Sequence, residues 1–154
     1  MTDLDAVLRS YQASLHSQEI VGDLLTKSRK GAMWHGTIFF NLPLDEARRM
    51  LTQAKMEMDD LTIVSLMSVF ERIIFDHPKS PLRKKSVRQR VKKLNVAISL
   101  FRRDISPRVY VDTELLCGYR NWVAHGKRWD KPAPALPVST HARLVEFLKQ
   151  ASIG

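Results

Sequence analysis

The chain has 154 residues, a common size for one domain, and its 44% of apolar residues can bury a core, which excludes a largely disordered chain. A single cysteine excludes a disulfide framework and any zinc site built from several thiols, and it favours a reduced compartment. The formal net charge of +9 favours polyanionic partners, because neutralising phosphates releases counterions.

The first half of the chain predicts two helices joined by a loop. Apolar residues at helical spacing predict a helix from 4 to about 25, which Gly22 could break or end. The segment 31–41 lacks a helical period and is predicted to be a loop with a short extended piece. Pro43 and the acids after it predict a second helix that runs to Asp76, before His77-Pro78. This long helix could kink at Asp59-Asp60.

The second half predicts a basic third helix, a fourth helix and a short final one. Pro81 opens the third helix, which Ser106-Pro107 ends, and the fourth is predicted over 111–126. The proline-rich segment 131–137 is predicted to be an extended linker, followed by a C-terminal helix over 139–150. We therefore predict one all-α domain over 1–154, an up-and-down helical bundle of four to five helices.

The predicted fourth helix carries the residues with the most informative spacing. Its apolar arc, which is predicted to face the bundle, comprises Leu115, Leu116, Tyr119, Trp122 and Val123. Along one edge of this arc lies a stripe of Glu114, Gly118, Asn121 and His125. Arg120 lies elsewhere, about 140° from His125 on the helical wheel. Because a glycine inside a helix costs about 1 kcal/mol relative to alanine, Gly118 indicates close approach of a ligand, a second helix or a second subunit.

Two segments of the chain resemble the HEPN superfamily. The run Arg120-Asn121-Trp-Val-Ala-His125 resembles its signature, in which an arginine and a polar residue precede a histidine late in a small bundle. The segment 66–74 is similar to the long HEPN helix in which an acid faces the active cleft, and Glu71 stands at that place. The resemblance covers roughly 45–127.

The resemblance implies a HEPN-like bundle that acts as an endoribonuclease without a metal or other cofactor. It implies a homodimer with a composite active site, in a toxin or defence setting where a neutralising antitoxin or other partner protein is common. The implied catalytic residues are Arg120, Asn121, His125 and Glu71.

The chemistry of these side chains agrees with that role. A histidine can take the proton of a 2′-hydroxyl, and an arginine can stabilise the negative charge of a pentacoordinate phosphorane. Asn121 is one turn from His125 and could orient it, while a Glu71–Arg120 pair would hold the guanidinium. We expect 2′,3′-cyclic phosphate and 5′-hydroxyl products, and no cleavage of DNA.

Basic residues are expected to contact the RNA. Eleven bases and one acid, Asp104, lie between Lys79 and Arg108. The residues predicted to bind RNA are Arg83, Lys84, Lys85, Arg88, Lys127 and Arg128. A charged run of this kind is most often the solvated face of a helix, which remains the alternative for the first four.

Two other functions remain open. One is a catalytically silent HEPN-like dimer that binds RNA or a partner protein, and the other is an unrelated basic helical protein that binds nucleic acid. His125 alone could be a helix-terminal histidine that interacts with the dipole, and Glu71 could be a buried acid paired with an arginine. The acidic N-terminal residues and the lack of a long apolar run lead us to expect a cytoplasmic protein with no membrane partner.

Overall fold

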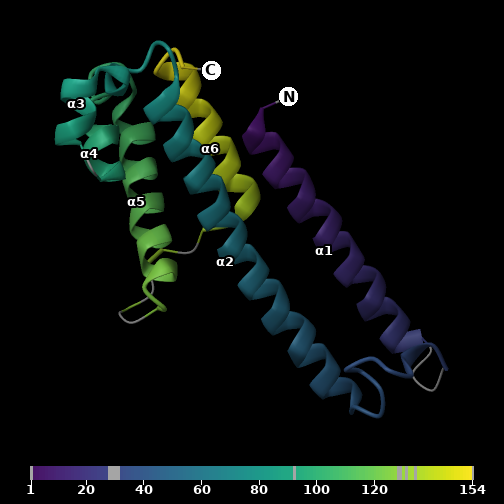
Figure 1. Ribbon diagram of the computed structural model, residues 1–154. Helices are drawn as coiled ribbons and strands as arrows, with labels where there is room; N and C mark the ends of the chain where they lie inside the picture. Colours follow the sequence, from purple (N-terminus) through teal and green to yellow (C-terminus); the bar gives the residue numbers. More distant parts are fainter. Residues whose placement is uncertain are drawn as a thin grey trace.

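A computed structural model describes residues 2–27, 32–91, 93–127, 130, 132–133 and 135–153. Its elements, in chain order, are α1 (Asp3–Lys27), η1 (Ala32–Trp34), α2 (Leu44–Asp76), η2 (Pro81–Arg83), α3 (Lys85–Arg90), α4 (Leu94–Ser99), α5 (Pro107–Ala124) and α6 (Pro137–Gln150). The described residues form helices and turns but no strand, so the predicted all-α class and the helical bundle are confirmed (Figure 1).

Helix α2 is the central element of the bundle. It contacts α1, α5 and α6, while α4 packs against α5 (Figure 1). Large fully buried side chains of the main core include Phe70 of α2 and Phe147 of α6, whose rings meet edge to face with 5.0 Å between centroids. The core therefore lies where α2, α5 and α6 come together.

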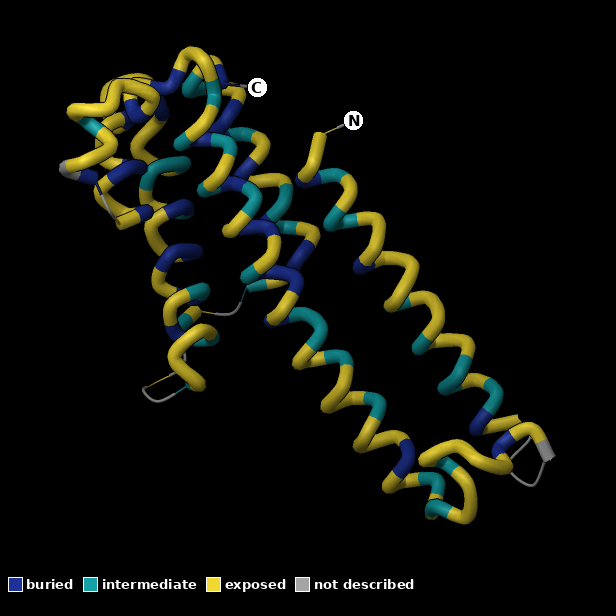
Figure 2. Tube along the Cα trace, viewed as in Figure 1, coloured by how far each residue is buried: buried dark blue, intermediate teal, exposed yellow. Residues whose placement is uncertain are grey.

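Helices α1 and α2 continue beyond this core as a long antiparallel hairpin, which Figure 2 shows as mostly exposed along its length. A second, small core at the tip of the hairpin contains Leu25, Trp34 and Ala47. Helix α1 passes through Gly22 without a break. The segment expected to hold a short extended piece contains η1 and turns instead, with Trp34 and Phe39 packed edge to face at 5.9 Å.

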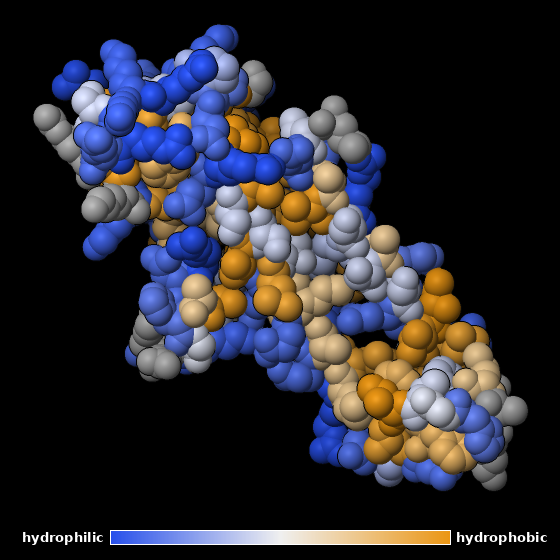
Figure 3. Space-filling view, in the orientation of Figure 1, coloured by the Kyte–Doolittle hydropathy of each residue, from blue (hydrophilic) through white to orange (hydrophobic). Residues whose placement is uncertain are grey.

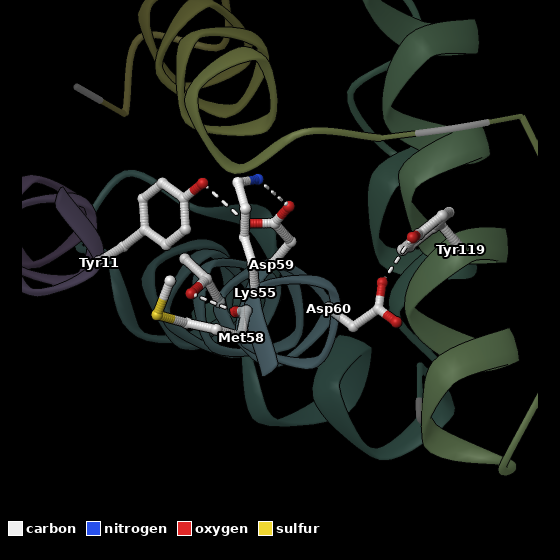
Figure 4. Close-up of polar contacts among 7 residues, drawn as sticks. Tyr11, Lys55, Met58, Asp59, Asp60 and Tyr119 are labelled. Carbon is white, nitrogen blue, oxygen red and sulfur yellow. Dashed lines mark hydrogen bonds and ion pairs between the residues drawn. The ribbon is translucent and has the colours of Figure 1, made fainter. Parts of the chain in front are cut away.

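Helix α2 remains continuous through Asp59 and Asp60, where the sequence allowed a kink. The hydroxyl of Tyr11 donates to Oδ1 of Asp59 at 2.7 Å, and the hydroxyl of Tyr119 donates to Oδ1 of Asp60 at 2.6 Å (Figure 4). Lys55 also binds Asp59, with 2.9 Å between Nζ and Oδ2. The two neighbouring aspartates therefore tie α2 to two different helices, α1 and α5.

The prediction of a single basic third helix is wrong. The chain forms η2, α3 and α4, and it is extended at Val91 (φ −105, ψ 97) and Lys93 (φ −120, ψ 138). Bases four residues apart, such as Lys84 and Arg88, repel each other, and the acid that pairs with Arg88, Asp76, lies on α2 rather than in this stretch. The apolar positions are buried nevertheless: Val91, Leu94, Ile98 and Phe101.

The fourth helix begins earlier than predicted. Pro107 is its first residue, and the side chain of Ser106 caps it by accepting a hydrogen bond from the Val109 N–H at 3.4 Å. The Ser-Pro pair is therefore a helix start, since proline is favoured in the first turn and serine at the N-cap. Helix α6 likewise begins at Pro137, two residues before the predicted position.

The predicted stop of the fourth helix at Gly126 is confirmed. Gly126 has φ of 72° and follows the C-cap residue His125, a place where a left-handed backbone favours glycine. The N–H groups of Gly126 and Lys127 donate to the carbonyls of Val123 and Trp122 at 3.0 and 2.9 Å, which closes the helix as a Schellman motif. In the predicted linker 131–137, positions 131 and 134 lie outside the described residues.

In the part of the chain that the structure describes, no helix has the length and apolar character needed to cross a membrane.

Candidate functional site

A polar cleft of about 710 Å³ lies between α2, the start of α4 and one side of α5. Its lining residues are Glu71, Lys93, Leu94, Asn95, Glu114, Cys117, Gly118, Arg120, Asn121 and His125. All four residues predicted to be catalytic are among them. The predicted stripe of Glu114, Gly118, Asn121 and His125 also lines this one cleft, because helical spacing puts these residues on the same side of α5.

Arg120 reaches across the cleft to α2. Its Nη2 is 3.3 Å from Oε2 of Glu71, and its Nη1 donates to Oδ1 of Asn121 at 3.2 Å. The side chains of Arg120 and Glu71 are 30% and 31% exposed, so the pair is accessible from solvent. The expected Glu71–Arg120 pair is thus present. Asn121 orients the guanidinium by accepting one of its hydrogen bonds.

His125 occupies the C-cap of α5, one turn after Asn121. Its backbone N–H donates to the Asn121 carbonyl at 3.0 Å. His125 lines the cleft and is exposed to solvent. The Schellman turn directly after it sends the chain away from the helix axis. His125 is therefore held on a regular backbone while its ring remains reachable from solvent.

Gly118 opens onto the cleft. A Cβ built at this residue would have no heavy atom within 4 Å, so no described part of the chain crosses α5 closely here. Of the reasons given for this glycine, a second helix of the described chain is contradicted, while a ligand or a second subunit stays a prediction. Leu115, which was expected to face the bundle, is instead 52% exposed.

Lys127 is bound by two carboxylates of α2. Its Nζ is 2.8 Å from Oδ2 of the buried Asp60 and 3.1 Å from Oε1 of Glu57, and it lies 5.8 Å from the centre of the Trp122 ring. These hydrogen bonds, first that to Asp60, raise the pKa of Lys127. Lys127 therefore stabilises the packing of the α5 terminus on α2. Arg128, also predicted to bind RNA, lies outside the described residues.

The remaining residues predicted to bind RNA lie outside the cleft, on η2, on α3 and, in the case of Lys84, between them. Arg83, Lys84 and Lys85 are exposed, and within the described ranges none has a carboxylate within 4.0 Å. Arg88 pairs with Asp76, with 3.0 Å between Nη1 and Oδ1. Figure 3 shows a strongly hydrophilic surface over this end of the molecule and apolar surface at the tip of the hairpin.

Four cleft residues were not assigned to the site from the sequence, namely Lys93, Leu94, Asn95 and Cys117. Lys93 and Asn95 had no recognisable signal, because the break between α3 and α4 decides where they point. Cys117 could have been found from its position four residues before Asn121 on the same helix. Burial raises the pKa of the Cys117 thiol to about 12, so the thiol is neutral near pH 7.

Fold and site together define the class of protein, an all-α bundle with a cleft lined by arginine, histidine and carboxylates. No protein-family model matches the chain, and no curated protein or solved structure matches it. In the described ranges, no group of three or more His, Cys, Asp or Glu side chains is placed to hold a metal ion.

Proposed function

We propose that the protein is a HEPN-type endoribonuclease that cleaves RNA without a metal ion. The observation that carries this proposal is the shared cleft. Arg120, Asn121 and His125 of α5 line it together with Glu71, which comes from a different helix and holds the guanidinium. A general base and a charge-stabilising donor are therefore available to one bound phosphodiester.

In the proposed reaction, His125 takes the proton of the 2′-hydroxyl, whose oxygen then forms a bond to the adjacent phosphorus. Arg120 stabilises the additional negative charge of the pentacoordinate phosphorane. The bond from phosphorus to the 5′ oxygen breaks, and the leaving oxygen takes a proton that a second histidine of a composite site would supply. The products are a 2′,3′-cyclic phosphate and a 5′-hydroxyl.

The basic surface supports RNA as the substrate. Arg83, Lys84 and Lys85 are exposed bases without ion-pair partners among the described residues, and Lys93 brings a further base to the rim of the cleft. Bases that are not neutralised within the protein can neutralise phosphates of a bound strand. Substrate binding would therefore extend from η2 and α3 to the cleft.

A homodimer with a composite site is part of the proposal. Val111 and Leu115, on the same helix as the catalytic residues, are 51% and 52% exposed, and Gly118 leaves open space beside them. Exposed apolar residues at helical spacing suit contact with a second copy. A toxin or defence role, a neutralising partner protein and a cytoplasmic location complete the proposal, on the strength of the resemblance and the composition.

The alternative is a catalytically silent dimer that binds RNA or a partner protein. The observation in its favour is that Glu71 and Asn121 already accept hydrogen bonds from the two terminal nitrogens of the Arg120 guanidinium. In this case the same polar contacts would serve only to hold α5 against α2.

The need for a 2′-hydroxyl distinguishes the proposed nuclease from the silent dimer. A structured RNA and the same molecule with 2′-deoxy sugars at every position are incubated separately with the protein, and their products are separated by size. The nuclease must cut only the RNA and leave cyclic-phosphate ends, whereas the silent dimer must leave both molecules intact.

A further inference from the structure

A second, shallow cavity of about 540 Å³, which is widely open to solvent, adjoins the candidate cleft. The two share Glu71, and the second extends along α2 past Ser68, Phe75 and Asp76 to Arg88 of α3. A ligand bound in the candidate cleft could therefore place a neighbouring group in this cavity.

The charges that line this cavity are already balanced. Arg72 forms an ion pair with Asp3, and Arg88 forms one with Asp76. The guanidinium of Arg88 also lies over the Phe75 ring, 5.8 Å from its centre. A planar arginine stacked on a half-buried aromatic ring is a surface on which a nucleobase stacks. The cavity suits a flat, neutral group better than a phosphate.

Helix α2 offers such a group both the N–H donors of Arg72 and carboxylate oxygens that accept hydrogen bonds. Asp76 uses Oδ1 and Glu71 uses Oε2 for their arginine partners, and each carboxylate retains a second oxygen that can accept hydrogen bonds. Ser68 donates its hydroxyl proton to the Val64 carbonyl at 2.8 Å, so its oxygen can accept as well. Acceptors select a base whose edge carries N–H donors, and guanine offers two such groups side by side.

We propose that this cavity binds the base next to the scissile phosphate of single-stranded RNA and prefers guanine. This inference rests on the proposed function, because the cavity is defined by its contact with the candidate cleft at Glu71. Phe75 and Arg88 supply the stacking surface, and the carboxylate of Asp76 accepts hydrogen bonds from the N–H groups of the base. Single-stranded RNA is the substrate class, since a paired base could not present that edge.

The test measures binding of RNA that cannot be cleaved. Fluorescent uridine oligonucleotides with 2′-fluoro sugars carry one guanine, adenine, cytosine or inosine, and affinities are read by fluorescence anisotropy. The guanine oligonucleotide should bind about tenfold more tightly than the inosine one, which lacks the 2-amino group. Asp76→Asn should abolish this preference, whereas Arg83→Gln should weaken all the oligonucleotides equally.

A second variant tests the stacking surface. Phe75→Leu keeps an apolar side chain against the core but removes the ring, and it should weaken the guanine oligonucleotide by about fivefold or more. Equal affinities for all four bases, or a guanine preference that survives Asp76→Asn, would overturn the inference. Because the oligonucleotides cannot be cut, failure of the proposed nuclease activity and failure of base recognition are separate results.

Discussion

Glu71 of α2 and Arg120 of α5 are 49 positions apart in sequence and meet across the candidate cleft, with 3.3 Å between Oε2 and Nη2. Both side chains are about one-third exposed, so water screens their attraction and the pair adds under about 1 kcal/mol to stability. Its effect is geometric, because the carboxylate limits the positions that a long guanidinium can adopt.

Glu71→Gln should therefore reduce RNA cleavage far more than it reduces stability. A misplaced guanidinium is expected to lower the cleavage rate by between about tenfold and 100-fold. The free energy of unfolding should change by less than about 1 kcal/mol. Asp112→Asn is the matched control, since Asp112 also pairs with an arginine of another helix, Arg143, at 3.7 Å. Full activity in Glu71→Gln would show that this pair has no part in catalysis.

The buried contact between Tyr119 and Asp60 should dominate the packing of α5 on α2. Tyr119→Phe removes a hydroxyl that donates to a buried carboxylate at 2.6 Å, and it should lower the free energy of unfolding by about 1.5–3 kcal/mol. Tyr110→Phe removes an exposed hydrogen bond to Glu114 and should cost less than about 0.5 kcal/mol. Urea denaturation followed by circular dichroism measures both. An equal loss of unfolding free energy in the two variants would contradict the dominant role of the Tyr119–Asp60 contact.

The raised pKa values of Tyr11 and Tyr119 predict a loss of stability at high pH. Burial, followed by the hydrogen bond to Asp59, raises the pKa of Tyr11 to about 12, and burial with the bond to Asp60 raises the pKa of Tyr119 further. A tyrosine of the unfolded chain has a pKa near 10. Because the folded-state pKa is the higher one, the stabilisation is complete below about pH 10 and is lost as the pH rises through 12.

Tyrosinate absorbance in the near ultraviolet tests this prediction. The native protein should ionise its tyrosines at higher pH than the protein in denaturant, and unfolding should accompany ionisation of Tyr11 and Tyr119. If all three tyrosines ionise near pH 10 while the protein remains folded, the hydrogen bonds of Tyr11 and Tyr119 to the two aspartates do not exist in solution.

Substitutions of Gly118 should affect the stability of helix α5 and the activity of the cleft in different ways. Gly118→Ala should stabilise the protein by about 0.5–1 kcal/mol, because alanine is the better helix former and its Cβ meets no atom within 4 Å. Gly118→Leu projects a larger side chain into the cleft and should reduce RNA cleavage. Thermal denaturation and a cleavage assay measure the two effects. A destabilised Gly118→Ala would indicate that a second copy of the chain packs closely on this glycine.

The helical wheel of α5 could be predicted because its periodicity depends only on local sequence. It correctly grouped Glu114, Gly118, Asn121 and His125, which line one cleft. The long α2 helix and its end at His77 could be predicted equally well, because the apolar spacing indicates the helix and the proline after His77 indicates its end. The HEPN resemblance itself stays a prediction.

Tertiary contacts account for what the sequence could not predict. Lys127 adjoins the motif and was expected to bind RNA, yet its nearest partners are Asp60 and Glu57 of α2, the latter 70 positions earlier. The stretch from Pro81 to Phe101 keeps the apolar spacing of one helix, but the chain is extended at Val91 and Lys93, and α4 then packs against α5 through tertiary contacts that the spacing does not reveal. Cleft residues that follow the break were therefore missed.

Cleavage of a mixed RNA pool in the presence of EDTA tests the central claim most directly. Wild-type protein is compared with His125→Ala and Arg120→Ala, and with His16→Ala and Arg49→Ala as exposed controls on the α1–α2 hairpin. We predict that wild type and the controls cut RNA in the chelator and leave cyclic-phosphate ends, whereas each cleft variant loses at least about 100-fold in rate. Wild-type protein that forms a stable dimer or binds RNA but cuts nothing would contradict the nuclease and establish the binding module instead.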